Sequence, residues 1–137
     1  MKWGGPYDPE LEAIWVPALA SCSEEESSYL AMILDTGTPI TVFHTPIAEF
    51  LGLDKSQSVG KVRFRGLVES LEGYQVIVPR FEVYGRVREN FKVAVCQLDP
   101  ELGIDGLIGK DFTRGLRTLL DDLDGRIIMT DERISIP

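Results

Sequence analysis

Histidine and cysteine are scarce in this sequence, and long apolar runs are missing. The chain has one histidine and two cysteines, Cys22 and Cys96, which lie too far apart to suggest a metal cage; His44 does not complete one. No apolar run approaches the roughly 18 residues that a membrane-spanning helix requires. The N-terminus also lacks the apolar segment of a secretory signal. We therefore expect a cytoplasmic protein without a metal, with two reduced thiols; a Cys22–Cys96 disulfide is the alternative.

Basic residues are also in deficit. The chain has 22 acidic and 14 basic residues, a formal charge of -8, so it lacks the basic surface expected of a general nucleic-acid or anionic-membrane binder. Its 137 residues, 44% hydrophobic, suffice for one buried core. We expect an irregular lead-in over residues 1–10, which contain Gly4, Gly5, Pro6 and Pro9, and one domain over residues 11–137.

The first half of the chain contains signals for a hairpin and a short helix. Residues 12–21 and 29–34 are apolar and flank a polar stretch with three consecutive glutamates at 24–26, which predicts a hairpin with a solvated acidic tip. The glutamates are either ordinary soluble surface or a docking patch. Residues 45–53 predict a helix of about two turns, with Thr45 as cap, Pro46 in the first turn and Gly52 at the end.

The second half reads mainly as β structure. Residues 61–97 predict three strands joined by tight connections, with Gly66, Gly73 and Gly85 as breaks. A short helix is expected over residues 110–116, and Asp124-Gly125 between apolar runs predicts a further hairpin. The whole chain is therefore predicted to be mainly β with two short helices.

The segment "LDTGT" places an aspartate directly after the apolar run of residues 30–34. A carboxylate there costs several kcal/mol unless it is satisfied. Gly37 lets the backbone approach closely, and the Thr36 hydroxyl can donate and accept hydrogen bonds. The tripeptide alone is a weak signal, and Asp35 could simply begin a β-turn.

A second signature, Leu107-Ile108-Gly109, follows later in the chain. The ordered pair of "ILDTGT" and "DGLIGKDF", with the glycine-bearing stretch "FRGLVESLEG" between them, resembles the retropepsin-like aspartic proteases over roughly residues 12–130. The resemblance implies a mainly β, closed barrel-like domain with a flap hairpin and one or two short helices.

The resemblance also implies an activity. One Asp-Thr-Gly supplies half of an active site, so a homodimer would bring two copies of Asp35 together. The pair would share one proton, one carboxyl activating water and the other protonating the leaving amine of a peptide or protein substrate. The implied function is an aspartic endopeptidase that needs no metal or cofactor.

Supporting roles follow from the same resemblance. Thr36, Gly37 and Thr38 would support the aspartate, while Gly66 and Gly73 are candidate hinges. The flap that covers the substrate would be formed by Arg65, Gly66, Leu67 and Val68. The cleft wall would be formed by Leu107, Ile108 and Gly109. The alternatives are an exposed hairpin for the flap and core packing for the two apolar residues.

Three features depart from the family pattern. Thr38 and Pro39 replace the usual small residue after the motif, and proline removes a backbone donor. Retroviral members pair an acidic residue near this position with a basic one after the second glycine, but only Lys110 is present here. The proposed flap also lacks the glycine cluster of retroviral members.

Other candidate residues and functions remain open. His44 fits an orienting or surface role before the helix better than a catalytic one. The cluster Asp121-Asp122-Asp124 lacks the central glycine and closing glutamate of a calcium loop and fits a solvated turn. The rival functions are a peptide-binding module of low or no activity on the same fold, and a plain β domain with a chance tripeptide.

Overall fold

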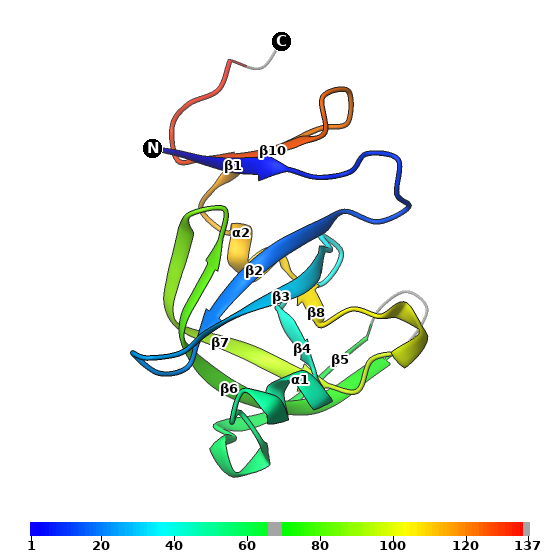
Figure 1. Cartoon of the computed structure of the whole chain (residues 1–137), viewed down its shortest axis with the longest axis vertical. Coiled ribbons are helices and arrows are strands. Elements are labelled where there is room, and N and C mark those ends of the chain that lie inside the picture. The colour runs from blue at the N-terminus through cyan, green and yellow to red at the C-terminus, as the bar shows by residue number, and fades with distance from the viewer. Residues whose placement is uncertain (66–69, 136–137) are drawn as a thin grey trace.

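The computed structural model describes residues 1–65 and 70–135 (Figure 1). Its strands in chain order are β1 Lys2–Pro6, β2 Trp15–Ser21, β3 Ser27–Leu34, β4 Val42–His44, β5 Gly60–Arg65, β6 Ser70–Val83, β7 Arg86–Cys96, β8 Gly106–Ile108, β9 Arg117–Asp121 and β10 Arg126–Thr130. Its helical segments are α1 Thr45–Phe50, α2 Lys110–Thr113 and the 3-10 turns Lys55–Gln57 and Pro100–Leu102. Among these described residues, neither α-helix has the length and apolar character that crossing a bilayer needs.

Most strands form one closed barrel. The sheet order is β2-β3-β8-β4-β7-β6-β5, and β2 also pairs with β6, which closes the first six strands on themselves and leaves β5 at the edge. In β2 and β3 the buried and exposed side chains largely alternate, as strands with one face on a core require. The predicted mainly β, closed barrel with two short helices is confirmed.

Aromatic rings form the centre of the core. Phe81 packs against Phe43, Phe91 and Phe112, with ring centroids 5.8, 5.5 and 5.6 Å away. Phe43, Phe81 and Phe112 are almost fully buried. Since Phe112 lies on α2, this cluster fixes the short helix against the barrel.

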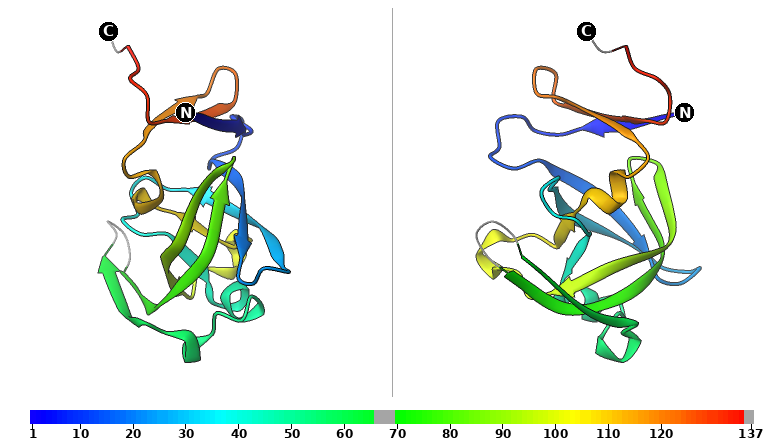
Figure 2. Two further views of the ribbon diagram at one scale, coloured as in Figure 1. Left: turned by 90° about the vertical axis from the view of Figure 1, so that its left-hand side faces the viewer. Right: turned by 180° about the vertical axis from the view of Figure 1, so that it is seen from behind.

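A separate three-stranded sheet has the order β1-β10-β9 and lies at the end of the molecule opposite the β5–β6 hairpin (Figure 2). The expectation that residues 1–10 are irregular was wrong for Lys2–Pro6, which pairs antiparallel with β10. Gly4 and Gly5 have no side chain and so allow other groups to pack directly against the backbone of β1. A Cβ on Gly4 would lie 2.4 Å from the Ile127 carbonyl oxygen, and one on Gly5 would lie 2.3 Å from the Tyr84 ring. The two glycines that suggested a loose segment in the sequence are needed for close packing.

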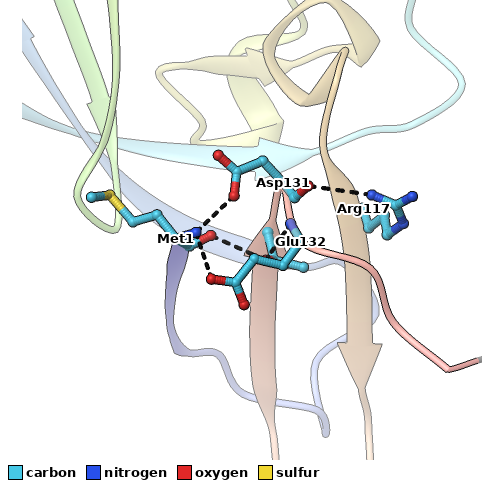
Figure 3. Close-up of polar contacts among 5 residues, drawn as sticks. Met1, Arg117, Asp131 and Glu132 are labelled. Atoms are coloured by element: carbon cyan, nitrogen blue, oxygen red, sulfur yellow. Dashed lines mark hydrogen bonds and ion pairs between the residues drawn. The ribbon is translucent and has the colours of Figure 1, made fainter.

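Polar contacts hold the N-terminus to the end of β10 (Figure 3). The Met1 ammonium donates to Asp131 at 2.7 Å and to Glu132 at 2.8 Å, while the Thr130 hydroxyl donates to the Met1 carbonyl. The two bonds from the ammonium raise the pKa of the amino group and lower the pKa of both carboxyls. The groups are largely exposed, so the pairs contribute little to stability.

The predicted hairpin and first helix are present, with one change at the helix start. β2 and β3 pair antiparallel around an exposed acidic tip. The expected cap at Thr45 was wrong: the N-cap is His44, whose side chain makes no capping bond, and Thr45 is already helical. Gly52 ends the turn with a φ of 80°.

The predicted strands of the second half are also present, but one glycine has another role. Gly73 lies inside β6 and pairs with Cys96 and Val62, so its expected role as a break or hinge was wrong. A Cβ there would lie 1.8 Å from the Val95 carbonyl oxygen, so the residue allows β6 and β7 to approach. The second helix and the β9–β10 hairpin form where predicted, although α2 ends at Thr113.

Both cysteines are free thiols. Cys22 is half-buried and Cys96 is buried, and burial raises the pKa of the Cys96 thiol to about 11. The alternative of a disulfide between them does not occur in the structure.

Candidate active site

Asp35 lies at the junction of two parallel strands. It directly follows β3, which pairs with β8 through Leu34 and Ile108, and its amide donates to the Ile108 carbonyl at 2.9 Å. The side chain is half-buried, while Thr36 and Gly37 are exposed. The two sequence signatures therefore meet in space, one on each strand, with the carboxylate at the end of the pair.

The loop itself orients the carboxylate. Oδ1 of Asp35 accepts the Gly37 amide at 3.0 Å, and Oδ2 accepts the Thr38 hydroxyl at 2.9 Å. The Thr38 amide also donates to the Asp35 carbonyl at 3.2 Å, which closes a β-turn. Asp35 therefore does begin a β-turn, and this turn orients the carboxylate by placing a hydrogen-bond donor of Gly37 or Thr38 at each of its oxygens.

Gly109 lets the second signature approach the back of this loop. A Cβ on Gly109 would lie 2.6 Å from the Ile40 carbonyl and 2.8 Å from the Thr38 carbonyl oxygen. The next amide, of Lys110, donates to the Thr38 carbonyl at 2.9 Å. Any larger residue would push the aspartate loop away from α2.

A buried polar network completes the attachment of the loop to α2. The Asp111 carboxylate accepts the Thr41 amide at 3.0 Å and the Thr41 hydroxyl at 2.7 Å. The same hydroxyl accepts the Gly109 amide at 3.1 Å, and Thr41 is fully buried. Sequence reasoning missed both residues, because a threonine and an aspartate far apart in the chain carry no signal of contact.

The network of Thr41 and Asp111 links the Asp35 loop to α2 without the ion pair that retroviral members form in this region. Pro39 is exposed and offers no charge, and Lys110 is exposed and makes no ion pair among residues 1–65 and 70–135. Asp111 instead holds the loop through a carboxylate that binds a hydroxyl and an amide. Such bonds to a charged group are stronger than neutral ones.

The proposed cleft and flap residues differ in their surroundings. Ile108 is fully buried in the main core, whereas Leu107 is half-buried beside a second apolar cluster. Leu107 is therefore the one of the pair that reaches the surface. Arg65 is the exposed last residue of β5, and the other three flap residues, Gly66, Leu67 and Val68, lie outside the described part of the chain.

His44 and the aspartate cluster have structural contacts. Nδ1 of His44 accepts the Leu98 amide at 3.0 Å, which ties the end of β4 to the residues after β7. Asp121 accepts two amides of the β9–β10 turn, and Asp122 accepts the Tyr7 hydroxyl. Among the described residues, no three His, Cys, Asp or Glu side chains gather as a metal site would require.

The sequence profile of a known family matches this region. The family is described as "Aspartyl protease", and the match spans residues 25–112, more than half of the chain. The chain belongs to this family. The matched range of the aspartyl protease profile contains Asp35, the Leu107-Ile108-Gly109 signature and the Thr41–Asp111 network.

Solved structures agree with this family's fold. A retropepsin-like aspartic protease from Rickettsia conorii superposes with a TM-score of 0.68 at 15% identity, over 94% of this chain and 92% of that chain. The retroviral protease-like domain of Ddi1 from Leishmania major gives a TM-score of 0.52 at 15% identity, over 82% and 80%. This member of the aspartyl protease family thus has a retropepsin-like fold. None of the curated proteins compared with the sequence matches it.

Proposed function

We propose that the protein is an aspartic endopeptidase whose catalytic group is Asp35. The observation that carries the proposal is the position of this carboxylate: it follows β3 beside β8 and is fixed by Gly37 and Thr38, inside the segment that matches the aspartyl protease family. A fixed carboxylate costs little further ordering when it acts on a bound water.

The chemistry needs two such carboxylates. Two carboxyl groups about 3 Å apart cannot both ionise cheaply, so they hold one proton between them, as is known for aspartic proteases as a class. One copy of Asp35 would take a proton from water as it attacks the peptide carbonyl. The protonated copy would polarise that carbonyl and later supply the proton to the leaving amine. The reaction requires no cofactor.

A second copy of the chain would supply the second carboxylate. The sequence has one Asp-Thr-Gly, and Thr36 and Gly37 are exposed and free to meet the partner's Asp35 loop. The three-stranded sheet offers contact area: in the described residues β1 and β9 each have one edge without a strand, and Met1, Leu119, Leu120 and Leu123 are exposed. Open strand edges and exposed apolar side chains both favour association of two copies.

The substrate would be an extended peptide. In this proposal Arg65, Gly66, Leu67 and Val68 cover it as a flap, and Leu107 lines the cleft with Ile108 and Gly109 behind it. An extended peptide exposes backbone donors and acceptors that strands can pair with. We propose a cytoplasmic location in keeping with the composition.

The test compares cleavage of a diverse unfolded-peptide pool by the parent and by Asp35→Asn, at several protein concentrations. We expect cleavage by the parent, loss of cleavage in the variant, and a fall on dilution steeper than the fall in protein concentration. Glu25→Gln, on the exposed acidic tip, removes the same charge and should cleave like the parent.

If a demonstrated dimer shows no cleavage that depends on Asp35 at any pH from acid to neutral, the endopeptidase proposal is wrong. The same cleft would then be better explained as a site that holds a peptide without cutting it.

A further inference from the structure

β5 is the outermost strand of the large sheet. It pairs with β6 from Gly60 to Arg65 and lies outside the closed barrel, on the far side of the molecule from the chain termini (Figures 1 and 2). Its other edge carries no strand in the part of the chain that the structure describes. An edge strand of this kind presents unpaired amides and carbonyls at alternate residues, which can pair with another extended chain.

The side chains on one face of β5 are all cationic. Lys61, Arg63 and Arg65 alternate along the strand, share one face by the two-residue period, and are exposed; we call them the cationic row. No acidic residue occurs between positions 55 and 68, although the whole chain carries a formal charge of -8. The positive charge on this edge is therefore local and runs against the charge of the rest of the protein.

Contacts within the chain leave most of this charge available. Arg63 pairs with Glu72 at 3.2 Å, but both side chains are 67% exposed, so water screens the pair and it contributes little. No ion pair involves Lys61 or Arg65 in residues 1–65 and 70–135. An anionic partner would thus meet cations that are not already neutralised in a buried pair.

A cavity lies beside the row. It has a volume of about 820 Å³ and lies between α1 and the β5–β6 hairpin. Its lining includes Lys55, Ser58, Lys61 and Arg63 from β5 and the turn before it, Glu72 and Tyr74 from β6, and Glu49 from α1. This volume accommodates several side chains of a bound segment.

We propose that β5 is a docking strand that binds an extended acidic segment of a partner polypeptide through its open backbone edge and the cationic row. In a segment added as a strand, alternate side chains lie on the face of Lys61, Arg63 and Arg65. Acidic residues at every second position would then form cross-strand pairs of opposite charge, each stabilising. The proposal does not depend on catalysis, because binding by β5 does not need the Asp35 carboxylate, although Arg65 at the end of the strand is also one of the proposed flap residues.

The test uses a fluorescent peptide of about ten residues that alternates glutamate and threonine, a composition that suits a strand and places every carboxylate on one face. Binding is measured by anisotropy on the full chain carrying Asp35→Asn, so that cleavage cannot confuse the signal. We expect saturable binding that weakens with added salt. A peptide with lysine in place of each glutamate should not bind, and methylation of alternate backbone amides should abolish binding by removing strand pairing.

Charge reversal in the protein provides the matched comparison. Lys61→Glu should weaken binding by about tenfold, because an attractive cross-strand pair becomes a repulsive one, and Lys61→Gln by a smaller factor. Lys92→Glu makes the same charge change on an exposed position of β7 and should change the affinity less than about twofold. Circular dichroism checks that each variant keeps its strand content.

Three results would overturn the proposal. The glutamate peptide could fail to bind, in which case the cationic row only protects an open edge from aggregation. Lys61→Glu and Lys92→Glu could weaken binding equally, which would make the attraction a general charge effect. The methylated peptide could bind as well as the parent peptide, which would exclude strand addition.

Discussion

Replacing Thr41 by valine should destabilise the protein far more than replacing it by serine. The Thr41 hydroxyl donates to Asp111 at 2.7 Å and accepts the Gly109 amide at 3.1 Å, and the residue is fully buried. Valine has nearly the same shape but removes both bonds. Serine keeps the hydroxyl and loses one methyl group.

The expected magnitudes follow from these contacts. Loss of a hydrogen bond to a charged group costs about 1.5–3 kcal/mol, and a buried amide without an acceptor costs about 1–3 kcal/mol. We expect Thr41→Val to lower the free energy of unfolding by about 3 kcal/mol, out of a total near 5–15 kcal/mol. Thr41→Ser should cost about 1 kcal/mol, the value of one buried methyl group.

Urea unfolding followed by far-ultraviolet circular dichroism measures the difference. At a typical slope of about 2 kcal/mol per molar urea, the valine variant should unfold about 1.5 M earlier than the parent. Protein concentration must be held fixed because dimerisation would add to the apparent stability. Equal midpoints for the valine and serine variants would show that the hydroxyl does not hold the Asp35 loop to α2.

Two further predictions concern the close contact between β6 and β7 and the hydrogen bond of the Tyr7 phenol. Gly73→Ala should lower the free energy of unfolding by at least about 1–3 kcal/mol, since the new Cβ would lie 1.8 Å from a carbonyl oxygen of the paired strand. In Gly60→Ala the new Cβ would meet only a side-chain oxygen at 3.4 Å, so this variant should be destabilised much less. The urea unfolding midpoints of the two variants test the difference. The hydrogen bond that the Tyr7 hydroxyl donates to Asp122 raises the pKa of the phenol to about 12, above the usual value of 10. The stability that this hydrogen bond contributes is therefore complete below pH 10 and is lost as the pH rises toward 12. A Tyr7→Phe variant should lose less stability than the parent between pH 10 and 12. Identical dependence of stability on pH in the two proteins would show that the Tyr7 hydroxyl does not make this bond.

The sequence predicted those parts of the site that depend on local order. The apolar run before Asp35 predicted a strand, the glycine after it predicted a sharp turn, and the pair of signatures predicted the family. These predictions succeeded because strands, turns and motifs are encoded by neighbouring residues. The acidic hairpin tip and the Asp124-Gly125 turn were found for the same reason.

Contacts between distant residues could not be predicted in this way. Thr41 and Asp111 meet across 70 positions, and neither is unusual in its own segment. Gly4 and Gly73 looked like breaks, because glycine marks a loose turn and a close approach of two strands equally well. Only the position of the neighbouring carbonyl, seen in the fold, distinguishes the two uses.

The pairing of β1 with β10 also constrains when the molecule can finish folding. Lys2 lies opposite Thr130, so β1 is synthesised more than 100 residues before β10, the strand that it pairs with. Closing so long a loop carries an entropic cost before any contact repays it, which makes such pairings slow to form. A nascent chain can close the barrel while β1 remains unpaired at the ribosome. The strand then becomes ordered only after β10 has left the exit tunnel.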